Sequence, residues 1–355
     1  MTGKLFREGG PLKVRRTGRD RYTMSVQIPQ DAEGRFAREC PDEACSPGYF
    51  KVKHRTGITG GQTEAFCPYC RQAAAPEDFT TKEQLRFARD RVMREAHDGI
   101  DRMIKSTLGL NASNRRSLGR GGPLSMEISY KRGTRPAVRR PFEDQVRRDV
   151  ICPHCGLDHS VYGLATWCAD CGADIFLTHV DTELAVVTAM LGDVNRRREA
   201  LGKRIAAKDL ENCLEDTVSI FETVLKIIVR RTLRERGATP EEADQAFHKI
   251  GNCFQNVERT AEYLSEKFHI PELPGLSAAE RDRLSQIFEK RHPITHNLGV
   301  VDRKYLEKAA AAAEEGREVS VTPEEITEAM AMAQRVFREL VGHLLPGEQG
   351  PPTAP

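Results

Sequence analysis

Apolar residues in the second half of the chain recur at helical spacing, whereas those in the first half form short runs between turns. Residues 207–236 show the strongest helical pattern, with two apolar stripes on one predicted helix. The stripes consist of Leu210, Leu214, Val218, Phe221, Leu225 and Ile228, and of Cys213, Ile220, Val224 and Ile227. Because such a helix is buried on two sides, we expect it to pack once within its own bundle and once against another subunit.

Helix-capping sequences mark the starts of three further helices. Thr239 and Thr322 are each followed by Pro-Glu-Glu, and Ser277 is followed three residues later by Glu280, as in capping boxes. The sequence therefore predicts that this part of the chain is helical. Other helical patterns cover about 80–108, 181–203, 256–268 and 301–315.

Four cysteines in the first half have the spacing of metal ligands. Cys40 and Cys45 are separated by four residues, and Cys67 and Cys70 follow as a Cys-x2-Cys pair. Four thiolates carried on hairpins can converge at about 2.3 Å from one tetrahedral zinc ion. His54 could replace one thiolate, although the four cysteines are the expected ligands.

A second group of cysteines, Cys152, Cys155, Cys168 and Cys171, consists of two Cys-x2-Cys turns that each precede a Gly. This pair resembles a zinc ribbon, and Gly suits the tight turn because it accepts positive φ. A redox dithiol needs only one such turn, so a metal is the better interpretation. Since four thiolates fill the tetrahedron, we expect two structural zinc ions and no cofactor for catalysis.

The fold class predicted from these patterns is α+β and multidomain, with two small β-rich zinc-ribbon modules, a helix between them and a helical bundle. Short strands are expected at 22–28, 49–53 and 124–130, and before Phe66. The predicted segments are a flexible basic arm (1–21), a first zinc-ribbon-like module (22–78), a helix (79–110), a basic linker with a strand (111–149), a second zinc ribbon (150–178), a connecting helix (179–204), the bundle (205–346) and a disordered tail (347–355).

The net charge of +2 conceals a division between the two halves. Residues 1–150 carry 30 Lys and Arg against 19 Asp and Glu, a net +11, and residues 151–355 carry 24 against 33, a net −9. A basic front half favours contact with a polyanion, with an ordinary Arg-rich surface as the competing interpretation. Residues 102–149 are the most basic stretch and the candidate for phosphate contacts, with a solvated linker as the alternative. Trp167 could stack on a base, although packing beside Cys168 is the expected role. The candidate nucleic-acid contacts are Lys131, Arg132, Arg135, Arg139 and Arg140.

The number of cysteines and the hydropathy of the chain indicate the cellular compartment. Ten cysteines are too few for a disulfide scaffold of this length, and no apolar N-terminal stretch has the form of a signal peptide. The longest apolar runs are too short to span a bilayer. We therefore expect a cytoplasmic protein that does not associate with a membrane.

The candidate chemistry lies in Arg291-His292-Pro293-Ile294-Thr295-His296, at the end of an amphipathic segment. Pro293 lacks the N–H that would bond to the carbonyl of Glu289, so a kink is expected there. The kink would bring a guanidinium and an imidazole to one side of the chain. A phosphodiester suits this pair of groups.

The run from Ile287 to Asp302 resembles the signature of the HEPN superfamily, in which Arg is followed by four to six residues and then His. His292 matches the polar residue that usually follows the Arg, and Cys253–Arg259 is similar to a second helical region of that family. The resemblance covers about residues 205–346. It implies an all-α homodimer that cleaves RNA without a catalytic metal ion.

The chemistry expected of the motif agrees with this resemblance. An imidazole can act as general acid or base near neutral pH, which makes His296 the candidate for proton transfer at the ribose 2′-hydroxyl or the 5′-oxygen. Arg291 would hold the phosphate, and His292 and Asn297 are candidate supporting residues. The expected products are a 2′,3′-cyclic phosphate and a 5′-hydroxyl, and DNA is spared.

A binding module is the alternative function. In that case the zinc ribbons bind nucleic acid or a protein, and a silent HEPN-like domain only dimerises. Under the nuclease interpretation, the resemblance favours a toxin or an antiphage-defence effector that an antitoxin or another partner protein restrains.

Overall fold

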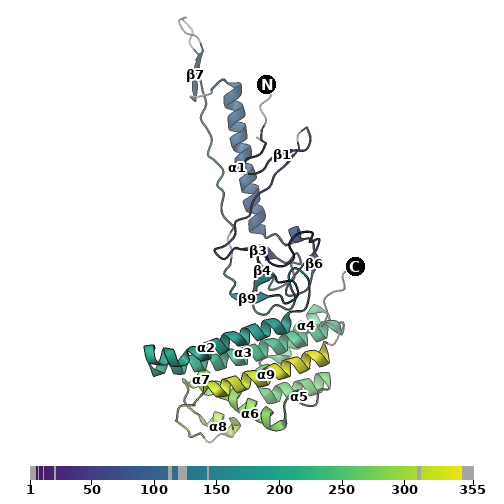
Figure 1. Cartoon of the computed structure of the whole chain (residues 1–355), viewed down its shortest axis with the longest axis vertical. Helices are drawn as coiled ribbons and strands as arrows, with labels where there is room; N and C mark the ends of the chain where they lie inside the picture. Colours follow the sequence, from purple (N-terminus) through teal and green to yellow (C-terminus); the bar gives the residue numbers. More distant parts are fainter. Residues whose placement is uncertain are drawn as a thin grey trace. The chain divides into compact units, whose positions relative to one another are not determined.

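The computed structural model of the chain (Figure 1) is a mixed α+β structure with small sheets in its N-terminal half and a helical C-terminal region. It describes residues 5–6, 8–10, 12–19, 21–110, 114–118, 126–141, 144–309 and 313–345. Two compact units are present. The first comprises Met1–Cys67, Gln72–Asp149 and Leu157–Tyr162, and the second comprises Pro68–Arg71, Val150–Gly156 and Gly163–Pro355.

The main sheet combines strands that were expected in separate modules. Its order is β3 (Arg35–Glu39), β4 (Tyr49–Lys53), β10 (Asp158–Val161) and β9 (Arg148–Ile151). β4 pairs antiparallel with both β3 and β10, and Val52 is opposite Phe36 on one side and His159 on the other. The segments of the two zinc-ribbon-like modules therefore share one four-stranded sheet, which is more stable than an isolated two-stranded hairpin.

Buried ion pairs hold this sheet together. The Arg35 side chain, 6% exposed, contacts Asp149 and Ser160 and bonds to Asp158 at 2.7 Å. Lys51 donates to Asp31 at 2.9 Å. Burial by itself raises the pKa of Asp31, but the Lys51 ammonium and two backbone N–H groups outweigh it and hold that pKa below its ordinary value.

The N-terminal half also contains one long helix and three two-stranded pairs among its described residues. α1 (Lys82–Thr107) follows η1 (Pro76–Phe79) and begins with a capping box between Thr81 and Gln84. The strand expected at 22–28 is limited to β2, whereas β8 lies within the strand expected at 124–130, of which 124 and 125 are outside the described residues. The two-stranded pairs are β1 (Arg15–Arg16) with β2 (Tyr22–Thr23), β5 (Ala65–Phe66) with β6 (Ala73–Ala74), and β7 (Arg115–Leu118) with β8 (Met126–Ser129).

Part of the segment expected to be a flexible arm is packed. Phe6, Leu12 and Val14 are buried, and Val92 and Ala96 of α1 pack against them. These apolar residues escaped attention in the sequence because Arg and Gly dominate the surrounding composition.

Nine helical elements follow in the C-terminal region as the structure describes it, and capping boxes at Thr239, Ser277 and Thr322 confirm the predicted starts. Residues 313 and 314 are not helical, so α8 is shorter than the helix expected at 301–315. The tail expected at 347–355 lies outside the described residues. The elements are α2 (Phe176–Leu201), α3 (Lys203–Glu235), α4 (Pro240–Ile250), η2 (Cys253–Gln255), α5 (Val257–Phe268), α6 (Ala278–Glu289), α7 (Arg291–Asn297), α8 (Arg303–Ala309) and α9 (Pro323–Leu344).

α3 is the central helix of the bundle, and α2 and α9 lie alongside it (Figure 1). The ring of Phe221 contacts Phe288 at 5.2 Å and Phe337 at 5.6 Å between centroids. Cys213 and Val224, on the second apolar stripe, are fully buried within the chain itself. Ile220 and Ile227 of the same stripe are only partly buried, so the expected contact of this stripe with another subunit stays a prediction.

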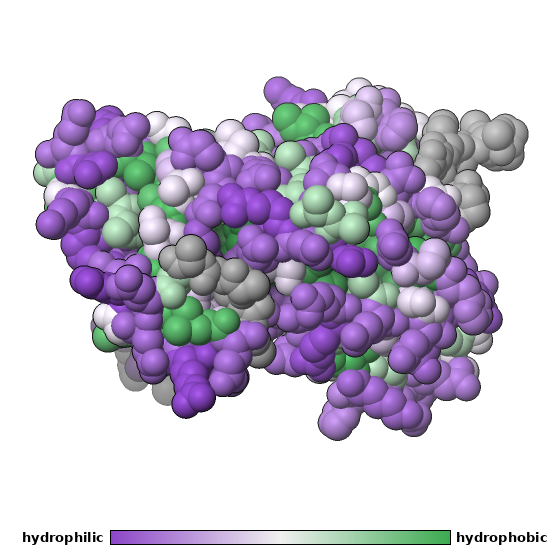
Figure 2. Space-filling model, turned by 90° about the horizontal axis from the view of Figure 1, so that it is seen from below, coloured by the Kyte–Doolittle hydropathy of each residue, from purple (hydrophilic) through white to green (hydrophobic). Residues whose placement is uncertain are grey.

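α2 belongs to the bundle and does not merely connect it to the part that contains the cysteine clusters. Leu184 and Val187 are buried in the same apolar cluster as α3 and α9, so the helical region begins before residue 205. Figure 2 views the structure from the end where Figure 1 draws α6 and α8, and hydrophobic residues on this face form small patches among hydrophilic ones. Among the described helices, none combines the length and apolarity that crossing a bilayer requires.

Candidate functional site

The Arg–His motif begins a new helix. α6 ends at Glu289, α7 starts at Arg291, and the N–H of Lys290 between them bonds to Ile287 at 3.3 Å. Pro293 occupies the first turn of α7, where its missing N–H costs no helical hydrogen bond. The predicted interruption is thus present as a break between two helices.

Lys290, the residue between α6 and α7, connects this junction to the start of α9. Its ammonium donates to the carbonyl of Ser320 at 2.6 Å and to Glu325 at 2.7 Å. Burial raises the pKa of Glu325, but the Lys290 ammonium more than offsets this, so the pKa lies below its ordinary value. The first turn of α7 therefore has a defined position in the bundle.

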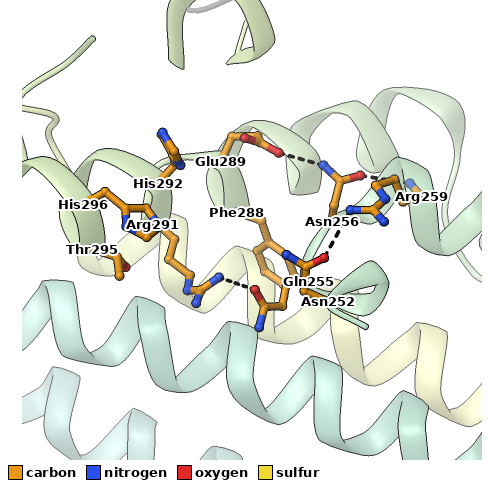
Figure 3. Close-up of a pocket in the computed structure, with 10 residues that line it drawn as sticks. All are labelled: Asn252, Gln255, Asn256, Arg259, Phe288, Glu289, Arg291, His292, Thr295 and His296. Atoms are coloured by element: carbon orange, nitrogen blue, oxygen red, sulfur yellow. Dashed lines mark hydrogen bonds between the residues drawn. The ribbon is translucent and has the colours of Figure 1, made fainter. Parts of the chain in front are cut away.

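A pocket of about 170 Å³ brings the motif together with η2, α5 and α6 (Figure 3). Three candidate site residues, Arg291, His292 and His296, line it. The remaining lining residues are Asn252, Gln255, Asn256, Arg259, Phe288, Glu289 and Thr295.

A neutral amide orients Arg291. Its Nη1 donates to Oε1 of Gln255 at 2.8 Å, and Nε2 of Gln255 donates to Glu222 of α3 at 2.8 Å. Figure 3 shows the Arg291 side chain directed toward Gln255. Within the described parts of the chain, no carboxylate is paired with this guanidinium. Its charge therefore remains available to an anion in the pocket.

Two imidazoles lie near Arg291. The ring centroids of His292 and His296 are 5.0 Å apart, and Nε2 of His292 is 3.8 Å from Oδ2 of Asp302. The N–H of Tyr305, followed by the amide of Asn297, lowers the pKa of Asp302. An ionised carboxylate therefore faces His292, whereas His296 is exposed.

Asn297, the second candidate supporting residue, does not line the pocket. Its Nδ2 donates to Asp302 at 2.7 Å, and the helix ends there with Leu298 in the left-handed conformation. The structure gives Asn297 a role in closing α7.

The pocket also contains polar residues that the sequence analysis did not select. Asn256 caps α5 and donates to Glu289 at 2.7 Å. Arg259, an exposed second cation, donates to Asn252 at 3.3 Å. The signal was present, since Asn256 and Arg259 lie in the segment that is similar to the family's second helical region.

The eight expected metal ligands form the two predicted clusters, Cys40, Cys45, Cys67 and Cys70, and Cys152, Cys155, Cys168 and Cys171. Sγ–Sγ distances are 3.7 Å for Cys45–Cys67, 3.8 Å for Cys152–Cys171 and 3.5 Å for Cys155–Cys168. A tetrahedron with bonds of about 2.3 Å has edges of about 3.8 Å, and a disulfide would need about 2.05 Å. Both clusters fit a structural metal ion such as zinc, and His54 belongs to neither.

The turns of the second cluster have the expected glycine geometry. Gly156 and Gly172 have φ of +77° and +64°, and the N–H groups of His154 and Asp170 point to Sγ atoms at 3.4 Å. Arg71 has φ of +65° at the equivalent place after Cys70. Hydrogen bonds within the cluster, first from Cys155, lower the pKa of Cys152.

Trp167 packs inside the protein. Its ring is 6% exposed and contacts the guanidinium groups of Arg71 at 4.2 Å and Arg231 at 4.8 Å. Arg231 is also paired with Asp174 at 2.5 Å. These contacts favour the packing role expected for Trp167 over stacking on a base.

The five candidate nucleic-acid contacts do not share one environment. Arg132 and Arg135 are paired with Asp98 of α1. Lys131, Arg139 and Arg140 are exposed.

Comparisons with known proteins found no matching family model, no matching curated protein and no matching solved structure. The resemblance to the HEPN superfamily therefore rests on the motif and its helical context.

Proposed function

We propose that the chain is a metal-independent endoribonuclease of HEPN type and that the pocket at α7 is its active site. The observation that carries this proposal is the meeting of Arg291, His292 and His296 in one pocket, with Arg291 held by a neutral amide. A cation and two imidazoles provide charge stabilisation and proton transfer for a phosphodiester.

In this mechanism, the ribose 2′-hydroxyl attacks the adjacent phosphorus, and the bond to the 5′-oxygen breaks. The 2′-hydroxyl loses a proton and the 5′-oxygen gains one. His296 transfers one of these protons and solvent transfers the other, and Arg291 stabilises negative charge on the non-bridging oxygens. His292, beside Asp302, helps to orient the phosphate. The products are a 2′,3′-cyclic phosphate and a 5′-hydroxyl.

We assign one structural zinc ion to each cysteine cluster. Four thiolates complete the tetrahedral coordination of each ion and leave no position for substrate. The ions would stabilise the small sheets, and catalysis would depend on the side chains at α7.

We further propose that a second copy of the chain completes the active site. Leu298 is 81% exposed and Val300 is 41% exposed immediately after the motif. Apolar side chains at this place suit a contact between copies next to the pocket. Light scattering should show a dimer for the parent protein and a monomer for Leu298→Asp.

From the resemblance to the HEPN superfamily, we propose that RNA is the substrate and that the protein acts as a toxin or antiphage effector in the cytoplasm. A partner protein would restrain it until cleavage is needed.

The test compares RNA cleavage by the purified parent, Arg291→Ala and His296→Ala proteins. Each substitution should reduce kcat at least about 100-fold, the scale of one lost general acid or charge-stabilising group. Arg234→Ala and His248→Ala change exposed residues of the same types outside the pocket and should retain activity.

The ends of the products decide between mechanisms. Cyclic phosphate ends, no cleavage after a 2′-deoxy substitution and activity that survives brief EDTA treatment are expected. Equal activity of the parent and both pocket variants would exclude the proposal. RNA binding without cleavage by any of the proteins would favour the binding-module alternative.

A further inference from the structure

A second pocket, in the unit that contains β3 and β4, has the chemistry of a nucleobase site. Its volume is about 280 Å³, near the lower limit of about 300 Å³ for small-molecule sites. No Asp or Glu is among its described lining residues, which include Gln27, Gln30, Phe36, Arg38, His54 and Gln84. We name it the Phe36 pocket.

Flat side chains form one wall of the Phe36 pocket. Phe36 and Arg38 lie two residues apart on β3, so their side chains share a face of the sheet. Cζ of Arg38 is 4.7 Å from the centroid of the Phe36 ring, and the His54 ring is 6.1 Å from it. Phe36 is half-buried and His54 is exposed. The Arg38 guanidinium lies over one face of the Phe36 ring, so a base can stack on the remaining ring surface or on the guanidinium plane.

Gln84 makes the floor of the pocket rigid. Its Nε2 donates to the carbonyl of Ala37 at 2.9 Å, and its Oε1 accepts from the N–H of Thr81 at 3.2 Å. Gln84 is buried, and it joins β3 to the first turn of α1. The stacking wall is therefore held in place before any ligand binds.

Two amides at the rim are available to a ligand. Gln27 and Gln30 are exposed and line the pocket. Among the residues that the structure describes, neither side chain has a hydrogen-bond partner. An amide offers a donor and an acceptor, which match the mixed donor and acceptor edge of a base.

We propose that the Phe36 pocket binds one base of single-stranded RNA. The base stacks on Phe36 and His54, its edge contacts Gln27 and Gln30, and Arg38 binds the neighbouring phosphate. A protein anchor inserts an aromatic or aliphatic side chain into a purely apolar pocket, whereas this pocket combines planar side chains with the Arg38 cation and two exposed amides. The proposal concerns binding and does not depend on the ribonuclease function.

The experiment measures binding of the full-length zinc-loaded protein to a fluorescent 12-nucleotide RNA with 2′-O-methyl groups throughout. This probe cannot form a cyclic phosphate, so cleavage does not affect the result. Phe36→Ala should weaken binding about tenfold, as for the loss of one stacked base. Phe36→Tyr keeps the ring and should bind within about twofold of the parent, and Gln30→Ala, an exposed change, should weaken binding about threefold.

Leu85→Ala is the matched control, because Leu85 is 58% exposed on α1 beside Gln84 but does not line the Phe36 pocket. It should bind as the parent does. A 5-iodouridine probe should crosslink to the peptides that contain Phe36 or His54.

Unchanged affinity in both Phe36→Ala and Gln30→Ala would overturn the proposal. Crosslinks confined to other segments, or occupation of the pocket by a peptide that RNA does not displace, would also overturn it. Should Phe36→Ala lose its zinc or its fold, Gln30→Ala and the crosslinks decide the question.

Discussion

The sheet of β3, β4, β10 and β9 and the helical bundle are stabilised by different interactions. The bundle has one continuous apolar cluster in which Leu214, Phe221 and Ile228 of α3 are fully buried. The sheet buries Arg35 and Lys51 in ion pairs, and the cysteine clusters lie beside it in sequence. Short strands bury little apolar surface, so ions and metal ligands replace it there. We therefore expect the region of the sheet to unfold when metal is lost and the bundle to unfold when apolar side chains are truncated.

Metal removal should have the largest effect. Cys152→Ser should reduce the zinc content from two ions per chain to one and unfold the second cluster, since a structural zinc ion contributes about 10–16 kcal/mol to a small domain. The helices should remain. Mass spectrometry of the native protein and limited proteolysis measure the two outcomes.

Cys213→Ala is the matched control for this prediction. Burial, followed by Asp216 and Asp209, raises the pKa of Cys213 to about 11, and Cys213 belongs to neither cysteine cluster. The variant should keep two zinc ions. A full zinc content in Cys152→Ser would show that the cluster does not bind metal through this residue.

Apolar truncation should have the next largest effect, and only on the bundle. Phe221→Ala removes a ring that contacts Phe288 and Phe337, and it should lower the free energy of unfolding by about 3–5 kcal/mol. Leu201→Ala, at a residue 60% exposed, should change it by less than about 0.5 kcal/mol. Urea titrations followed by the helical circular dichroism signal compare the two variants with the parent. If Phe221→Ala also lost zinc, the sheet and the bundle would not be stabilised independently.

The same comparison explains what could be predicted from the sequence. The capping boxes at Thr239, Ser277 and Thr322, and the cysteine spacings, are signals contained within a few residues. The pairing of β4 with β10 joins strands about one hundred positions apart, and no local pattern encodes it. The Arg–His pocket was predicted only in part, because Gln255 reaches Arg291 across 36 positions.

Gln255 tests whether the polar contacts at the pocket have a function. Gln255→Leu removes the acceptor for Arg291 and leaves Glu222 without its amide donor. Under the proposed ribonuclease function, kcat should fall about tenfold, the cost of one hydrogen bond to a charged group. This loss is smaller than that of Arg291→Ala because the guanidinium remains.

Gln255→Glu separates position from charge. The new carboxylate can still hold Arg291 but neutralises it, so KM should rise and should depend more steeply on salt than in Gln255→Leu. If both variants leave kcat and KM unchanged, Gln255 is a structural residue and does not position Arg291.

The smallest effect expected is electrostatic, at the surface of the bundle. The N–H of Ser277, followed by the Arg335 guanidinium, lowers the pKa of Glu280 from an ordinary value of 4.5 to about 2. A lowered pKa in the folded state means that the ionised form stabilises the fold. This contribution is complete above pH 4.5 and is lost as the pH falls toward 2.

Glu280→Gln keeps an acceptor for Ser277 but removes the ion pair with Arg335. The parent should therefore have the higher Tm at pH 7, by a degree or two at most because the pair is exposed, and the two curves should converge near pH 2. Both proteins lose zinc in acid, so the difference between their helical melting curves isolates Glu280. If the plots of Tm against pH for the two proteins are parallel over the whole range, the hydrogen bonds of the cap stabilise the start of α6 without the charge of Glu280. The bundle would then depend on apolar burial even at its ends.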